Sequence, residues 1–141
     1  MSGKEALINI KGTQLNDCGE EDIIEITTKG KYFIKDQAFY LIYQDGDLTG
    51  MANTITSIKA QSGKVILNRM GDIEQRQVFE EGKLNESNYV TAQGTLLMGV
   101  IPSVVGVSLT DKAGSINLEY VLEIDRKKVS NNQLLITLRE V

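Results

Sequence analysis

The chain has 141 residues, of which 41% are hydrophobic and 24% are charged, and its net charge at pH 7 is −4. This length and composition are typical of one globular domain, which we place at residues 1–141, and they exclude a disordered or fibrous chain. The acidic balance opposes attraction to phosphate backbones, so we expect no nucleic acid among the partners.

The chain contains one cysteine, Cys18, so no disulfide can form within it. That usage indicates a reducing compartment. The first residues lack the basic and then apolar pattern of a secretory signal. The longest apolar-rich run, residues 96–109, is interrupted by Gly99, Pro102 and Gly106 and is too short to span a bilayer. We therefore expect a cytoplasmic protein that does not enter a membrane.

Apolar and polar residues alternate along most of the chain, which is the pattern of strands with one buried face. Turns rich in glycine and small polar residues separate the runs at hairpin spacing. The clearest run is 115–125, whose apolar positions share one face: Ile116, Leu118, Tyr120, Leu122 and Ile124. In chain order, the predicted strands are residues 6–14, 22–29, 31–35, 38–44, 54–60, 64–68, 73–80, 87–92, 95–109, 115–125 and 133–141.

Strands joined by short hairpins would leave two exposed edges if their sheet stayed flat, and closure removes those edges. The sequence therefore predicts an all-β protein with a single antiparallel up-and-down β-barrel of about 8–10 strands, rather than a sandwich. The sole proline, Pro102, cannot donate a backbone hydrogen bond to a sheet. We expect the run 95–109 to bend or break there.

Two hairpins also receive a predicted register, since a shift of one residue would turn an apolar face outward. A loop of residues 69–71, with Gly71 at positive φ, would place Leu67 opposite Ile73. In that register Gln75 and Gln77 point inward. A loop of residues 111–114 would place residue 109 opposite residue 116.

Six segments, in this order and spacing, resemble the YwiB-like family of small bacterial proteins of unknown function. They are Gly30–Phe33, Phe39–Tyr43, Asn68–Gly71, Phe79–Gly82, Tyr89–Thr91 and Gly114–Tyr120. The resemblance spans nearly the whole chain and implies a calycin-like, or lipocalin-like, β-barrel. Barrels of this kind often enclose small apolar ligands, so ligand binding is the function that the analogy implies. It implies no catalytic residues.

The chain has no histidine, which excludes Ser-His-Asp and Cys-His catalysis and histidine-ligated metals. With a single cysteine, a cysteine-rich zinc or iron–sulfur site within one chain is also excluded. Neither of the glycine-rich nucleotide-binding fingerprints occurs. We therefore expect no catalytic residues, no metal site and no cofactor.

The predicted ligand-binding residues are Arg69, Gln75, Gln77, Tyr43 and Tyr89. Two glutamines on a buried face need partners, which a polar ligand or a structural network could supply. Arg69 would lie at an opening of the barrel, where its guanidinium could meet an anionic group or form a salt bridge with a nearby acid. The tyrosines could line a pocket or only pack in the core.

The sequence thus favours a non-catalytic binding module whose barrel holds a small, partly apolar molecule. The alternative is a structural or regulatory protein-interaction module with an interior filled by its own side chains. A small enzyme that works without histidine is a third, less favoured reading. A small-molecule ligand is the expected partner of the first class.

Overall fold

A computed structural model describes residues 4–45, 54–110 and 113–141, and these form ten β-strands. Their bounds are β1 Lys4–Asn16, β2 Glu21–Lys35, β3 Ala38–Asp45, β4 Thr54–Gln61, β5 Lys64–Gly71, β6 Gln75–Glu80, β7 Asn85–Thr91, β8 Gly94–Leu109, β9 Ala113–Ile124 and β10 Lys127–Glu140.

The strands form one antiparallel sheet in the order β6-β5-β4-β3-β2-β1-β10-β9-β8-β7. Every neighbour in this order is also a neighbour in the chain, except that β1 pairs with β10 and brings the two termini together. The outer strands β6 and β7 then meet at a single backbone bridge between Glu74 and Val90, with N···O distances of 3.0 and 2.9 Å. The predicted up-and-down barrel is therefore confirmed, and it is nearly closed.

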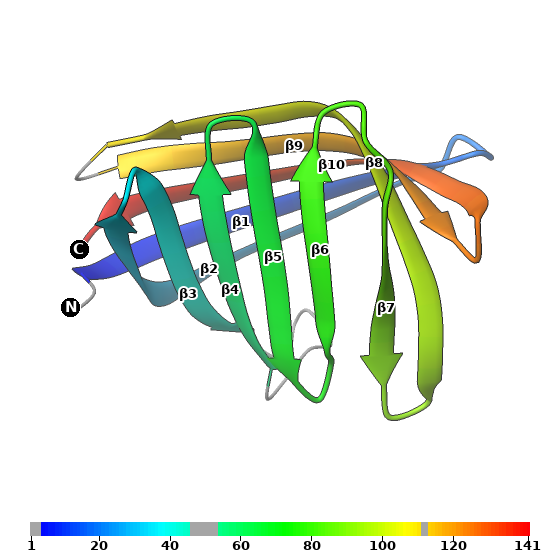
Figure 1. Ribbon diagram of the computed structural model, residues 1–141, viewed down its shortest axis with the longest axis horizontal. Coiled ribbons are helices and arrows are strands. Elements are labelled where there is room, and N and C mark those ends of the chain that lie inside the picture. The colour runs from blue at the N-terminus through cyan, green and yellow to red at the C-terminus, as the bar shows by residue number, and fades with distance from the viewer. Residues whose placement is uncertain (1–3, 46–53, 111–112) are drawn as a thin grey trace.

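The barrel has two walls of different character (Figure 1). The long strands β1, β2, β9 and β10 form the rear wall, and the shorter strands β3 to β6 cross in front of them. The hairpin β1–β2 and the hairpin β9–β10 extend past the front strands at one side, opposite the termini. The end at which β5 turns into β6 and β7 turns into β8 is called the mouth below.

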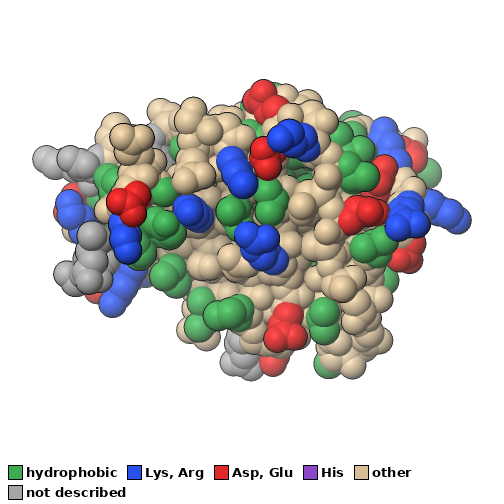
Figure 2. Space-filling view, viewed as in Figure 1, with side chains coloured by type: hydrophobic (Ala, Val, Ile, Leu, Met, Phe, Trp, Pro, Cys, Tyr) green, Lys and Arg blue, Asp and Glu red, His purple; other side chains and the backbone are tan. Residues whose placement is uncertain are grey.

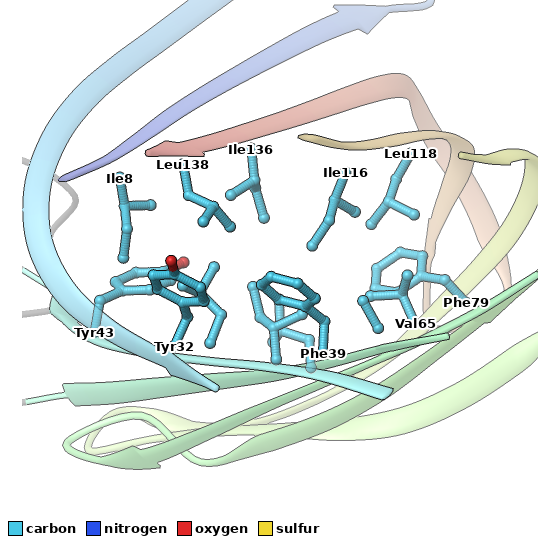
Figure 3. Close-up of a cluster of buried hydrophobic side chains, with 14 of the residues drawn as sticks. Ile8, Tyr32, Phe39, Tyr43, Val65, Phe79, Ile116, Leu118, Ile136 and Leu138 are labelled. Atoms are coloured by element: carbon cyan, nitrogen blue, oxygen red, sulfur yellow. The ribbon is translucent and has the colours of Figure 1, made fainter. Parts of the chain in front are cut away.

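Apolar side chains from the two walls meet inside the barrel (Figure 3). One row comes from the rear wall and the facing row comes mainly from the front strands, and nearly all of these side chains are less than 7% exposed. The rear row is Ile8, Leu138, Ile136, Ile116 and Leu118, and the facing row is Tyr43, Tyr32, Phe39, Val65 and Phe79. These side chains fill much of the interior.

The predicted break between residues 22–29 and 31–35 is wrong, because β2 runs unbroken through Gly30. Gly30 lies opposite Ala6 of β1 and Tyr43 of β3, at the point where β2 is paired on both of its edges. A glycine inside a strand often marks such a close backbone approach instead of a turn.

Both predicted hairpin registers are also wrong, by an even number of residues. Arg69 pairs with Gln75 and Leu67 with Gln77, so that Ile73 lies in the loop. Gly71 does have a positive φ, of 132°. In the second hairpin, residue 109 pairs with Gly114 instead of residue 116. Residues 111–112 of that loop lie outside the described residues.

The irregularity expected at Pro102 is confirmed as a β-bulge. The pairing of β8 with β9 shifts between Pro102 and Val104, which leaves Ser103 as the extra residue. Pro102 and Val105 are both buried, although three positions separate them. The bulge therefore keeps both halves of β8 facing the interior.

Candidate functional site

Three of the predicted site residues lie together inside the barrel, near the mouth. Arg69 of β5 is directly opposite Gln75 of β6, and Gln77 follows on the same face of β6. The Nη1 atom of Arg69 donates a hydrogen bond of 2.8 Å to Oε1 of Gln75. Nε2 of Gln75 donates one of 3.1 Å to Oε1 of Gln77. Both glutamines are buried, so their predicted inward orientation is observed even though the predicted register is not.

Gln77 connects β6 to β7 across the gap in the barrel wall. Its Nε2 donates to the backbone oxygen of Asn85 at 2.9 Å and to Asn85 Oδ1 at 2.8 Å. Its Oε1 accepts from Ser87 Oγ at 2.9 Å, in addition to Gln75. Asn85 Oδ1 also accepts from the backbone N–H of Val78. All the hydrogen-bonding capacity of the Gln77 amide is thus used within the protein.

The guanidinium of Arg69 is only partly satisfied. Its Nη1 binds Gln75, whereas its Nε is buried and has no hydrogen-bond partner. Among the described residues, no carboxylate forms an ion pair with Arg69. The alternative prediction, a salt bridge between Arg69 and a nearby acid, is therefore not observed among the described residues. A buried donor without a partner is costly, because it has lost its hydrogen bonds to water without gaining others.

A cavity of about 60 Å³ adjoins these polar groups. Its polar lining consists of Arg69, Gln75, Gln77 and the phenol of Tyr120. Its apolar lining consists of Leu67, Phe79, Met98, Val100, Leu122 and Leu134. The site holds amides, a phenol and a guanidinium, which are suited to binding and are poor proton acceptors at neutral pH.

Tyr120 reaches the cavity from β9 on the rear wall. Its ring packs edge-on against Phe79, with 5.1 Å between the ring centroids. Burial raises the pKa of the Tyr120 phenol above its ordinary value. The hydrogen bond with the Asn132 side chain and the positive charge of Arg69 oppose that rise without cancelling it.

Tyr120 should therefore titrate later than an ordinary phenol. Because its folded pKa is raised above the unfolded value of 10.0, its contribution to stability is fully present below that pH and is lost as pH rises through the folded pKa. Phenolate absorbance of the native protein should include a late-titrating component that Tyr120→Phe removes. If the variant instead loses a phenol that ionises at the ordinary pH, the expectation is wrong.

The other two predicted site residues do not line this cavity. Tyr43 is 5% exposed and packs in the core beside Ile8 and Tyr32 (Figure 3). It is two strands away from Arg69, because Thr56 lies between them in the same cross-strand row. Tyr89 is half-buried on β7, two positions beyond Ser87, and it is not part of the cavity wall.

The structure adds four residues to the site that sequence reasoning did not assign to it: Asn85, Ser87, Met98 and Tyr120. Asn85 and Ser87 alternate along β7 with exposed residues, so they carry the same signal as Gln75 and Gln77, namely polar side chains at inward positions. The predicted strand began at residue 87, and so it excluded Asn85.

The described residues contain no group of three or more histidine, cysteine or acidic side chains placed to hold a metal ion. None of them belongs to a helix that is long and apolar enough to cross a membrane.

These observations define a class of protein: a small, nearly closed antiparallel barrel with an apolar interior and a polar network beside a cavity near its mouth. The model of a family described as a domain of unknown function, DUF1934, matches residues 8–136, and the chain belongs to this family.

A relative and a solved structure support this assignment. The chain is 25% identical over 123 residues to the uncharacterized beta-barrel protein YwiB of Bacillus subtilis (strain 168). The aligned region covers 87% of this chain and 85% of that protein. The crystal structure of the ywiB protein matches with a TM-score of 0.87 at 22% identity, covering 98% of this chain and 92% of that one. The resemblance to the YwiB-like family and its barrel fold is thereby confirmed.

Proposed function

We propose that this chain is a non-catalytic binding protein that holds a small, partly apolar molecule in the mouth of its barrel. The observation that supports this function is the cavity beside Arg69, whose lining combines apolar side chains with a few convergent polar groups. Small-molecule sites in proteins have this composition. We place the protein in the cytoplasm, which agrees with an exposed and unpaired Cys18.

Native mass spectrometry of the full chain, purified from its own host without organic solvent, tests this function. We expect a species heavier than the bare chain by the mass of one small molecule, and we expect denaturation to release that molecule. If the spectra contain only the bare chain, and the emptied protein binds no small probe in solution, the proposed function is wrong.

One observation favours the alternative function, a protein-interaction module. The outer face of β3 to β6 carries a groove of about 360 Å³, which includes Tyr40, Ile42, Ile66 and Arg76. Figure 2 views this face and shows apolar and basic side chains gathered on it. Exposed apolar side chains that lie together are often partner contacts. In the same native spectra, this function would be recognised by a bound protein instead of a bound small molecule.

A further inference from the structure

The positive charge of Arg69 lies inside the barrel wall, and none of the described carboxylates forms an ion pair with it. Of the described residues, those that line the cavity beside it are neutral, chiefly Gln75, Tyr120 and the apolar wall, whereas Glu74 and Arg76 share a separate, more open pocket with it. Removing a cation from water is unfavourable unless an opposite charge or hydrogen-bond acceptors compensate for it. The oxygen of Gln75 supplies one neutral acceptor, and the described lining of the cavity supplies no negative charge.

The free part of the Arg69 guanidinium has the geometry that a carboxylate requires. Nη1 is engaged by Gln75, whereas the buried Nε has no partner. Nε and Nη2 form one edge of the planar guanidinium, and two parallel N–H donors on such an edge match the two oxygens of a carboxylate.

A second buried polar atom without a partner lies at the same end of the barrel. It is the hydroxyl oxygen of Thr54, a fully buried residue on the inward face of β4. Thr56 pairs with Arg69, so Thr54 is the diagonal neighbour of Arg69 across the two strands. Diagonal positions on one face lie within reach of long side chains. Thr54 and Arg69 thus both carry an unused polar group on the inward face near the mouth, although only Arg69 lines the cavity.

The volume of the cavity restricts the ligand that it can take. A cavity of about 60 Å³ holds on the order of five water molecules, at about 10–15 Å³ for each. This is enough for a carboxylate with a very short aliphatic chain, whose carbon atoms would contact Leu67, Leu122 and Leu134. An inorganic phosphate would place oxygen atoms instead of carbon atoms against that apolar wall, which is unfavourable.

We infer that the ligand of this barrel is a short-chain aliphatic monocarboxylate, bound through its two oxygens to Nε and Nη2 of Arg69. This inference rests on the proposed function and names its ligand class. The aliphatic part of the ligand lies against the apolar wall of the cavity.

Nitrogen–proton correlation NMR of the full chain tests the inference directly through the Arg69 Nε–H signal. The probes are acetate, propionate and butyrate, the matching neutral amides acetamide, propionamide and butyramide, and inorganic phosphate. We expect the carboxylates to shift the Arg69 Nε–H signal saturably in the millimolar range and to bind at least about tenfold more tightly than the amides and phosphate.

A pair of variants provides the matched comparison. Arg69→Gln should weaken carboxylate binding by about tenfold or more. Arg76→Gln removes the same charge from an exposed position on the outer face of β6 and should leave binding unchanged. Because the wild-type Nε–H signal reports binding by itself, the test does not depend on the variant's stability.

The failures of the two proposals can be distinguished. If amides or phosphate bind as tightly as carboxylates, or if carboxylates bind without moving the Arg69 Nε–H signal, the inferred ligand class is wrong while small-molecule binding stands. If no probe binds and native spectra show only the bare chain, the proposed function itself is wrong.

Discussion

Replacing Gln77 by leucine is expected to lower the free energy of unfolding by about 3 kcal/mol. Leucine fills a similar volume but leaves Ser87 Oγ without its acceptor and Asn85 Oδ1 without one of its two donors, both in the buried gap between β6 and β7. Buried polar groups that lose their partners carry a full desolvation penalty. Urea unfolding followed by circular dichroism measures the effect.

The matched control for this prediction is Gln133→Leu. Gln133 is exposed on β10 and donates a hydrogen bond of 3.1 Å to Asn117 at the surface, so its loss should change stability by only about 0.5 kcal/mol or less. Equal stability losses in the two variants would show that the Gln77 network contributes little to closing the barrel.

Replacing Gly30 by alanine is expected to destabilise the fold by about 2–4 kcal/mol. A methyl group at this position would overlap the backbone oxygen of Ile42 and would lie 2.5 Å from Cδ1 of Ile8 and 3.0 Å from Cβ of Tyr43. The backbone oxygen belongs to the paired strand β3 and cannot move without disturbing the ladder. Thermal and urea unfolding of the variant give the magnitude.

Gly12→Ala is the control for this prediction. Gly12 lies on the neighbouring strand β1, and a methyl group added there would meet nothing within 4 Å. Alanine inside a strand restricts the unfolded chain, so this variant should be neutral or more stable by up to about 1 kcal/mol. A loss of stability as large as that of the Gly30 variant would mean that glycine is required in these strands for another reason than close approach.

The hydrophobic alternation predicted which face of each strand is buried, but it could not define how far each strand slides along its neighbour. The hairpin β5–β6 is displaced by four residues from the predicted register and the hairpin β8–β9 by two. Because side chains alternate with a period of two, an even displacement leaves every apolar residue on its predicted face. Gln75 and Gln77 therefore point inward as predicted, although their partners differ.

Long-range pairing limited what could be predicted about the site. The alternation on residues 115–125 placed Tyr120 on a buried face, but nothing nearby in the chain indicates that β9 faces Arg69 and Gln77 across the barrel. Tyr43 shares a cross-strand row with Arg69, two strands away, yet it packs beside Ile8 and Tyr32, at the opposite end of the apolar cluster from Phe79, which lines the cavity. That Tyr120 completes the polar lining of the cavity could thus be learned only from the closed structure.

The single backbone bridge between Glu74 and Val90 also determines where the barrel is expected to open locally. Every other neighbouring pair of strands is joined by a ladder of at least six residue pairs, whereas β6 and β7 share this one bridge and the side-chain bonds of Gln77 and Asn85. Local opening follows the route that breaks the fewest bonds. Parting these two strands would widen the interior while the rear wall stays intact, so exchange of amide protons with solvent should begin along β6 and β7.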